Sequence, residues 1–489
     1  MAFNTRSKIV ATLGPASDSD ETIGELVQAG VDVFRINAAH CTPKKIGQLI
    51  RKIRKVDRLL KVGVGVMVDL QGPKIRVGSF LNAEPIWLQS GMNLIISTEP
   101  GLVGEKAANG ETTRIGTRYA SLAQDVKPRE RILLDDGNIE LRVVKVDGTE
   151  VTTRVVYGGL LKQHKGINLP GSKVSTDCLT ADDLADLEVA LDRGADFIAL
   201  SFVRSHRDIE RLREHIGRLG SDAEIIAKIE RPEAVKNLTK IIAASDSLMV
   251  ARGDLGVEMG PELVPGLQKK IIQEAVEARK PVITATQMLE SMVLNPRPTR
   301  AEASDVANAI YDGTSAVMLS AETASGRYPL QAVKIMNRIL RESERDIFGV
   351  NAVLRLRRDP NRRSSVTLAT VRASVYAAMD VGAKAIAVFT EAGGTVRAVA
   401  AERAPTLVIA FTPYQRTVQR LSLVWGVQAI KASRTRTSHE MTLEAEQTLL
   451  ERRLAKPGDT VVVVVGASRK QGLTNIMNIR TLEPRNPSS

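Results

Sequence analysis

Cysteine and aromatic residues are scarce in this chain of 489 residues. Two cysteines, Cys41 and Cys178, are too few for a disulfide framework or a cysteine-rich metal cluster. Aromatic residues make up 3% of the chain, which leaves little material for stacking nucleic-acid bases. No signal peptide and no apolar run of about 20 residues, the length of a membrane span, is found. We therefore expect a cytoplasmic protein without a membrane or nucleic-acid partner.

The charge is biased toward positive, at +12, but the basic residues are spread along the chain. One cluster, RLRRDPNRR at 355–363, is the exception, and the sequence does not fix its role. Charge bias alone is a weak indication of nucleic-acid binding, and anionic small substrates explain a positive protein as well. The length suits about three domains.

Strand-like and helix-like segments alternate over residues 1–72 and again from residue 180 to 345. In the second helical segment, 42–60, apolar residues keep the three-and-four spacing of one buried helix face. The alternation yields eight strands, each followed by a helix except the third. It predicts a (β/α)8 TIM barrel with helices outside, as the catalytic domain, over 1–72 and 172–345.

The exception after the third strand is an insertion, 73–171, far longer than an ordinary strand-to-helix connection. Its apolar residues alternate, and Asp147-Gly148 is typical of a hairpin turn. We expect a small inserted all-β lid domain, a β-barrel, over the mouth of the TIM barrel. Beyond a basic, proline-containing stretch, short apolar runs in 346–489 predict a C-terminal α/β regulatory domain with a sheet between helices.

Nearly every predicted barrel strand ends in a polar or charged residue. Barrel enzymes carry their chemistry at these carboxyl ends, and charged groups there are costly unless they are paired or coordinated. The residues are Arg35, Asn37, Asp69, Ser201, Lys228, Glu230, Arg252, Asp254, Thr286, Gln287 and Glu322. A functional site is the simplest explanation.

Glu230 and Asp254 end the neighbouring fifth and sixth strands and suit a hard divalent ion such as Mg²⁺. The alternative, equally open at this point, is a structural network in which Lys228 and Arg252 neutralise the two carboxylates. Lys228 lies two residues before Glu230 and therefore on the same face. It could stabilise a transferred phosphoryl group or serve only as an ion-pair partner.

Arg35 suits bidentate binding of a phosphate, although pairing with Asp69 is also reasonable. Thr286, taken alone, is more often a structural hydroxyl than a proton relay. The residues thus predict a metal-assisted barrel enzyme that acts on an anionic, phosphorylated small molecule. They do not fix the reaction.

Strings at these same positions resemble the pyruvate kinase family along nearly the whole chain and in order. They are KIVATLGPAS, FRINAAH, DLQGPKIR, KGINLPG, SFVRS, AKIERPEAV, VARGDLGVE, TATQMLESM, PTRAEASDVANAI and DGTSAVMLSAETASGRYP. The resemblance implies transfer of the phosphoryl group of phosphoenolpyruvate to ADP, giving ATP and pyruvate in the last step of glycolysis. It also implies a homotetramer.

The resemblance further implies roles for individual residues. Glu230 and Asp254 would bind Mg²⁺, with Mn²⁺ as an acceptable substitute, and a second Mg²⁺ would arrive with ADP. Lys228 would stabilise the transferring phosphoryl group and the enolate, and Thr286 would serve the proton path through water. The implied substrate contacts are Arg35, Asn37, Asp69, Ser201, Gly253, Asp254 and Thr286, and the implied nucleotide contacts are Asn37, His40, Arg76 and Lys165.

The segment VDLQGPKIR departs from the potassium-dependent relatives. Those relatives hold K⁺ with Asn37, Asp69 and hydroxyl residues at positions 39 and 70, and they carry a glutamate at position 74. This chain has Ala39, Leu70 and Lys74. An ammonium group can occupy a monovalent-cation site, so we expect Lys74 to supply the charge and K⁺ not to be required. A solvated hinge lysine is the alternative.

Two loops of the C-terminal region correspond to the effector site of the family. They offer Thr390, Gly393, Gly394 and Thr395 in the first loop, and Ser468 and Arg469 in the second. A sugar monophosphate or AMP, or no effector, is expected there, although the glycine-rich turns could be purely structural.

Two rival functions stay open. One is a lyase of the same metal-dependent barrel type acting on pyruvate or phosphoenolpyruvate, and the other is a catalytically silent regulatory or RNA-binding protein. Ser315, where relatives usually carry aspartate, and the string NAAHC at 37–41 are departures without an interpretation from the sequence.

Overall fold

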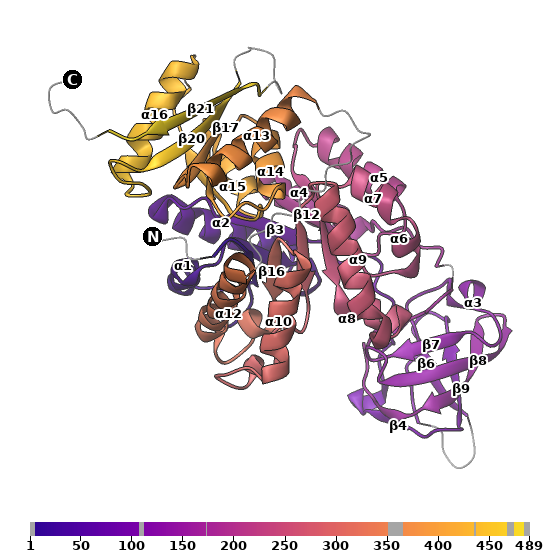
Figure 1. The fold of residues 1–489 in the computed structure, drawn as a ribbon. Coiled ribbons are helices and arrows are strands. Elements are labelled where there is room, and N and C mark those ends of the chain that lie inside the picture. The colour runs from indigo at the N-terminus through magenta and orange to yellow at the C-terminus, as the bar shows by residue number, and fades with distance from the viewer. Residues whose placement is uncertain are drawn as a thin grey trace.

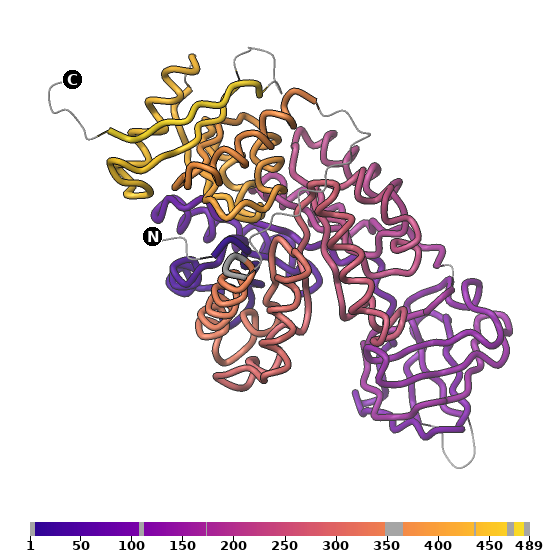
Figure 2. The backbone as a smooth tube through the Cα atoms, viewed as in Figure 1, coloured from indigo at the N-terminus to yellow at the C-terminus, as the bar shows by residue number. Residues whose placement is uncertain are grey.

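The computed structural model describes residues 5–106, 112–172, 174–350, 365–434, 437–466 and 474–483. A central barrel lies between a β-rich inserted region at one end and a smaller α/β region at the other (Figures 1 and 2). Within the described residues no helix is long and apolar enough to cross a bilayer.

Eight parallel strands close the barrel in the order β1-β16-β15-β14-β13-β12-β3-β2. Their bounds are β1 (Lys8–Thr12), β2 (Val33–Asn37), β3 (Gly65–Asp69), β12 (Phe197–Leu200), β13 (Glu224–Ile229), β14 (Ser247–Ala251), β15 (Val282–Ala285) and β16 (Ala316–Leu319). The barrel that the alternation predicts is therefore confirmed, including the pairing of the fifth and sixth strands, β13 and β14.

Helices cover the outside of the barrel (Figure 1). The main ones are α1 (Asp20–Ala29), α2 (Pro43–Leu60), α4 (Ala181–Asp192), α5 (His206–Arg218), α6 (Pro232–Lys236), α7 (Leu238–Ala244), α8 (Arg252–Met259), α9 (Val264–Glu277), α10 (Arg300–Asp312), α11 (Ala321–Ala324) and α12 (Pro329–Val350). Short 3-10 turns lie at η1 (Ala38–His40), η3 (Pro261–Leu263) and η4 (Glu290–Val293).

Helix α2 illustrates how sequence positions these elements. Thr42 caps its N-terminus by accepting a hydrogen bond from the Lys45 amide, and Pro43 occupies the first turn. Its buried face carries the apolar residues of the three-and-four pattern, Ile46, Leu49, Ile50, Ile53 and Val56. These side chains join the main core between barrel and helices.

The insertion between β3 and β12 is β-rich, as predicted. It contains η2 (Leu81–Ala83), β4 (Ile86–Leu88), β5 (Asn93–Ser97), β6 (Thr113–Gly116), α3 (Leu122–Asp125), β7 (Arg131–Leu134), β8 (Ile139–Asp147), β9 (Glu150–Tyr157), β10 (Gly159–Leu161) and β11 (Ile167–Asn168). The strands form a six-stranded sheet and a two-stranded sheet. Bridges from Arg76 to Gly166, beside β11, and from Val77 to Thr117, beside β6, link the two edges of the larger sheet. Its own apolar core lies around Leu94, Ile132 and Leu141.

The C-terminal region holds a five-stranded sheet in the order β19-β18-β17-β20-β21. The strands are β17 (Ala385–Phe389), β18 (Leu407–Thr412), β19 (Val427–Lys431), β20 (Thr460–Val465) and β21 (Ile476–Thr481), and the helices are α13 (Val366–Asp380), α14 (Gly394–Ala401), α15 (Gln415–Leu421) and α16 (Ser438–Glu451). Separate apolar clusters cover the two sheet faces, so the expected arrangement of a sheet between helices is confirmed.

One strand of the C-terminal sheet differs from the expectation. The antiparallel edge strand β21 was not predicted, because IMNIRT is short and its outer side chains are exposed. Helix α12 runs to Val350, and no proline or glycine interrupts it between Pro329 and Gly349. The arginine cluster at 355–363 lies outside the described residues.

Candidate active site

The carboxyl ends of four barrel strands bring five predicted residues into one buried cluster. Arg35 lies in β2, Asp69 ends β3, Ser201 follows β12, and Lys228 and Glu230 lie at the end of β13. Parallel strands in a closed barrel present their carboxyl ends on one side, and these strands are neighbours there. The polar strand ends therefore converge as the alternation predicts.

Asp69 is the centre of this cluster and is 1% exposed. Its Oδ2 accepts hydrogen bonds from Arg35 Nε at 2.8 Å and pairs with Nη2 at 2.7 Å, while Oδ1 lies 3.4 Å from Lys228 Nζ. Burial disfavours ionisation of Asp69, yet Lys228, Arg35 and Lys74 together lower its pKa. The pairing of Arg35 with Asp69, left open by the sequence, is thus present in the structure.

Lys228 is held by three partners. Its ammonium lies 3.3 Å from Glu230 Oε2, 3.4 Å from Asp69 Oδ1, and donates to Ser201 Oγ at 2.6 Å. Burial by itself would lower the pKa of Lys228, but Asp69, Glu230 and Asp254 outweigh it and raise the pKa above the usual lysine value. The site therefore holds a permanent positive charge at a fixed point.

Glu230 is the buried member of the expected metal pair, at 1% exposed. Its Oε1 accepts the Phe202 amide at 2.5 Å. Its Oε2 faces Lys228 but makes no hydrogen bond. Burial raises the pKa of Glu230, Lys228 opposes that effect and the Asp254 charge adds to it. A buried carboxylate oxygen without a hydrogen bond suits coordination by a hard cation.

Asp254 lies in the first turn of α8, directly after β14, and is exposed toward the site. It acts electrostatically on Glu230, Lys228 and Lys74. The part of the chain that the structure describes has no cluster of three or more potential metal-ligating His, Cys, Asp or Glu side chains. Two carboxylates fit an ion such as Mg²⁺, which completes its coordination shell with substrate oxygens and water.

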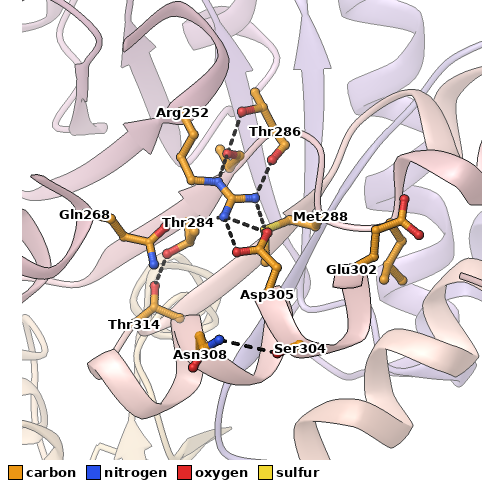
Figure 3. Close-up of polar contacts among 12 residues, drawn as sticks. Arg252, Gln268, Thr284, Thr286, Met288, Glu302, Ser304, Asp305, Asn308 and Thr314 are labelled. Atoms are coloured by element: carbon orange, nitrogen blue, oxygen red, sulfur yellow. Dashed lines mark hydrogen bonds and ion pairs between the residues drawn. The ribbon is translucent and has the colours of Figure 1, made fainter. Parts of the chain in front are cut away.

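Arg252 does not take part in the carboxylate network that the sequence left open. It turns away from Glu230 and Asp254, and its Nη1 pairs with Asp305 of α10 at 2.7 Å. Figure 3 shows its guanidinium between that carboxylate and the chain around Thr286. Of the two bases proposed to neutralise the carboxylates, only Lys228 does so.

Thr286 and Gly253 contact each other. The Gly253 amide donates to Thr286 Oγ1 at 2.9 Å, and this hydroxyl in turn donates to the Ala285 carbonyl at 2.7 Å. Thr286 and the exposed Gln287 adopt positive φ angles of 68° and 52°. Glu322, another strand-end residue, is fully buried and accepts backbone amides of Leu289 and Ser320, so it has a structural role.

A cavity of about 350 Å³ opens between the barrel and the inserted region. It is lined from the barrel side by His40 and Asp254, and from the insertion by Lys74, Arg76 and Lys165. Lys165 pairs with Asp135 at 2.6 Å, and this contact raises the lysine pKa. Partial burial, together with the charges of Lys74, Arg76 and Arg35, lowers the pKa of His40. Three of the four candidate nucleotide residues, His40, Arg76 and Lys165, therefore line one cavity, whereas Asn37 does not line it.

Lys74 lies at the rim of this cavity with part of its side chain exposed. Surrounding protein atoms and the charges of Lys228 and Arg76 lower its pKa, while Asp254 and Asp69 oppose them. Nearby, Asn37 caps η1 by accepting the Ala39 amide at 3.3 Å. Lys74 is thus an exposed lysine that lines the cavity, and the charges of the site act on its pKa.

Sequence reasoning missed two basic residues that line the same cavity, Arg204 and Arg231. Arg231 is 5% exposed and pairs with Glu258 of α8 at 3.3 Å. Arg204 donates to the Val174 and Thr176 carbonyls. Both follow strand ends, in the strings SFVRS and AKIERPEAV. Their closeness in sequence to Ser201 and Glu230 could have predicted that they line the site.

The first candidate effector loop is partly ordered by its own hydroxyls. Thr390 Oγ1 accepts the Gly393 amide at 2.9 Å, and Gly393, with φ of 88°, precedes α14, which begins at Gly394. Thr395 Oγ1 lies 2.7 Å from Thr474 Oγ1 of the second loop. Ser468 and Arg469 lie outside the described residues.

Comparisons with known proteins agree along nearly the whole chain. The family described as pyruvate kinase, barrel domain, matches residues 4–333, and the pyruvate kinase alpha/beta domain matches residues 368–480. Pyruvate kinase of Mycobacterium tuberculosis is 41% identical over 482 residues, covering 98% of both chains. That of Methylorubrum extorquens is 40% identical over 481 residues, again covering 98% of both.

A solved structure extends the similarity to the fold. The crystal structure of a pyruvate kinase from Cryptosporidium parvum superimposes with a TM-score of 0.91 at 33% identity, covering 98% of this chain and 96% of that one. The agreement includes the barrel, the insertion and the C-terminal region in one arrangement.

Proposed function

The chain belongs to the pyruvate kinase family of phosphotransferases, and on that premise we propose how its site transfers the phosphoryl group of phosphoenolpyruvate to ADP. The family generally uses Mg²⁺ and K⁺. The observation that carries the proposal is the Lys228 ammonium, which Asp69, Glu230 and Ser201 fix in a buried position beside Asp254.

Glu230 and Asp254 would hold the Mg²⁺, or Mn²⁺ in its place. When bound, the ion supplies positive charge that neutralises the substrate oxygens during transfer. Lys228 contributes a second positive charge that needs no reorganisation, because its three partners fix it before the substrate arrives. Its raised pKa keeps it protonated over the range in which the enzyme works.

Arg35 binds the phosphate of phosphoenolpyruvate in this proposal, and Asp69 orients it. Two of its nitrogens bond Asp69, and its third, Nη1, donates to Thr12 Oγ1 at 3.1 Å. A guanidinium held on one edge can present its other edge to a phosphate. Asn37, Ser201 and the backbone of Gly253 complete the substrate contacts, and His40, Arg76 and Lys165 bind the phosphates of the nucleotide.

Thr286 serves the last step, in which the enolate takes a proton at C3 and becomes pyruvate. Its hydroxyl is positioned by the Gly253 amide, next to the candidate metal ligand Asp254. The proton comes from solvent through this hydroxyl and an intervening water.

Lys74 replaces K⁺ as the monovalent charge of the site. The support is the electrostatic attraction of Lys74 to Asp254 and Asp69, which opposes the larger effects of burial, Lys228 and Arg76 on its pKa. The chain also lacks hydroxyls at Ala39 and Leu70. An ammonium there would perform the same charge balance as a bound ion.

The test is the initial rate of ATP formation from phosphoenolpyruvate and ADP in Tris buffer, with and without K⁺. We expect the wild type to be fully active without K⁺, and Lys74→Glu to become partly dependent on it. Lys162→Glu, a charge reversal in the inserted region, is the control and should leave the K⁺ response unchanged. Strong activation of the wild type by K⁺ would refute the role of Lys74.

The named relatives are all pyruvate kinases, so no observation favours a lyase or a silent binding protein. Regulation by a sugar monophosphate or AMP at the Thr390–Thr395 loop, and assembly as a homotetramer, belong to the same proposal. Rate measurements over a panel of sugar phosphates and nucleotides, and light scattering against the 53.1-kDa chain mass, test them.

A further inference from the structure

Arg252 makes more backbone contacts near the site than its position at a strand end suggests. Its Nε donates to the Ala285 carbonyl at 3.2 Å, and Nη2 donates to the Thr286 carbonyl at 2.7 Å and to Met288 Sδ at 2.8 Å. Its Nη1 donates to Asp305 Oδ1 at 2.8 Å and lies 2.7 Å from Oδ2. The Arg252 side chain, 11% exposed, thus contacts three of the four residues in the segment 285–288 and pairs with Asp305 of α10 (Figure 3).

The segment 285–288 has an unfavourable backbone conformation. Thr286 and Gln287 have φ of 68° and 52°, in the left-handed region. For a β-branched residue such as threonine this is a genuine outlier, and each such residue costs about 1–3 kcal/mol. Such a conformation persists only where surrounding contacts hold it, and the Thr286 carbonyl bond from Arg252 is one of those contacts.

The same arginine is adjacent in sequence to the other half of the site. Gly253 follows it and donates its amide to Thr286 Oγ1 at 2.9 Å, and Asp254 comes next in the first turn of α8. Arg252 therefore ties the β15–η4 segment to the start of α8 through its side chain, while Gly253 ties them through its backbone. These two links hold Thr286 against the start of α8, where Asp254 lies.

We infer that Arg252, anchored by Asp305, is the positioning residue for the proton-transfer step. It holds Thr286 in the left-handed conformation in which the threonine hydroxyl meets the Gly253 amide. The inference rests on the proposed function, because it presupposes that Thr286 lies on the proton path. It assigns Arg252 no contact with substrate or metal.

The chemistry that depends on this geometry is one protonation. The electron pair of the C2–C3 double bond of the enolate forms the new C3–H bond, and the C2 oxygen becomes the ketone oxygen. The proton originates from solvent, and the Thr286 hydroxyl that passes it on is reprotonated by water. Phosphoryl transfer is already complete, so a misplaced Thr286 should impair protonation more than transfer.

Lysine cannot replace this arginine. An ammonium can pair with Asp305, but it is a point charge that cannot span carbonyls and carboxylate as the planar guanidinium fork does. Arg252→Lys consequently keeps the positive charge and removes the hydrogen bonds to the Ala285 and Thr286 carbonyls. Displacing a catalytic group by about 1 Å can cost about 10²-fold in rate.

The experiment follows the exchange of pyruvate methyl protons with D₂O by NMR, in the presence of Mg²⁺ and ATP. It is compared with phosphoryl transfer from phosphoenolpyruvate, with KM and with Tm. We expect Arg252→Lys to slow exchange by about 10- to 100-fold, with a smaller loss in transfer and little change in KM for phosphoenolpyruvate. Asp305→Asn, a change on a partly exposed side chain, should give a weaker loss of the same kind.

Arg213→Lys is the matched control. Arg213 also bonds a backbone carbonyl and an aspartate, Ala244 and Asp246, but at the opposite end of β14. It should leave both rates unchanged. Unaltered exchange in Arg252→Lys or Asp305→Asn, or equal losses of both rates accompanied by a lowered Tm, overturns the inference while the proposed function stands. Absence of ATP formation by the wild type would instead reject the proposed function.

Discussion

Asp69 shows how far residue types alone can predict a site. The sequence placed Arg35, Asp69, Lys228 and Glu230 at strand ends, and the period-two rule of strands put Lys228 and Glu230 on one face. The structure brings these residues together. Sequence could not predict that Arg252 turns away, because its partner Asp305 lies 53 residues further on, in another helix.

Asp186 offers a test of residue-level electrostatics away from the active site. It is 7% exposed in α4, and burial together with Asp183 and Asp182 raises its pKa to about 6. The raised pKa favours the folded state while the carboxyl is protonated, below about pH 4, and this contribution is lost as pH rises through about 6.

We therefore expect Asp186→Asn to raise the free energy of unfolding by about 1–2 kcal/mol at pH 8 and to have little effect at pH 4. Urea unfolding at both pH values measures the difference. Glu188→Gln, an exposed carboxylate of the same helix, is the control and should change neither value. A gain of equal size at both pH values would contradict the assignment.

At the scale of elements, the connection from β3 to the insertion illustrates what a sequence does predict. Gly72-Pro73 indicates a turn, and Gly72 has φ of 66°. A Cβ at this position would lie 2.7 Å from Phe202 Cδ2. Phe202 matters because its amide holds Glu230. The turn was readable from the sequence, whereas the contact with Phe202, 130 residues away in the chain, was not.

Gly72→Ala should accordingly destabilise the fold by about 2–3 kcal/mol, because it combines left-handed strain with a clash. It should also raise the Mg²⁺ concentration needed for half-maximal rate, since Phe202 and with it Glu230 must shift. Gly171→Ala is the comparison: its φ is 79°, but nothing lies within 4 Å of the added Cβ, so about 1 kcal/mol of strain is expected alone. Equal effects of the two substitutions on Tm and on the Mg²⁺ requirement would rule out the Phe202 contact.

The spacing of apolar residues predicts most of the order of helices and strands along the chain. Eight strand and helix alternations leave few alternatives to a closed barrel, and that barrel is what forms. The strand that was missed is the exposed edge strand β21, where the pattern is weak. Sheet closure within the insertion depends on pairing between distant strands, which alternation does not encode.

At the scale of the whole molecule, the departure at Ser315 gains an interpretation. Ser315 precedes β16 at the end of the barrel opposite the active site, and its Oγ lies 3.5 Å from Arg403 Nη2 of the C-terminal region. Arg403 also donates to the Gly313 carbonyl at 2.7 Å and stacks on Trp425 at 4.5 Å. Burial lowers the pKa of Arg403 to about 10 although the charge of Glu344 opposes this effect, and no described carboxylate lies within ion-pair distance of the guanidinium.

An aspartate at position 315 would give this buried guanidinium a counter-charge across the interface. We expect Ser315→Asp to raise the free energy of unfolding by about 1–3 kcal/mol at neutral pH, because the buried charge gains a hydrogen-bonded partner. Ser315→Asn, similar in size but neutral, should not stabilise. Thermal unfolding of the two variants and the wild type decides the matter, and equal Tm values for the aspartate and asparagine variants would show that charge is not what the interface lacks.

The central claim concerns one fixed ammonium beside two carboxylates, and Lys228→Met tests it most directly. The measurement pairs the rate of ATP formation with the affinity for Mn²⁺, followed by electron paramagnetic resonance. We predict a loss of about 10³-fold or more in kcat, with Mn²⁺ affinity not weakened, because Glu230 and Asp254 stay in place. A Lys228→Met enzyme that turns over as fast as the wild type would contradict the account.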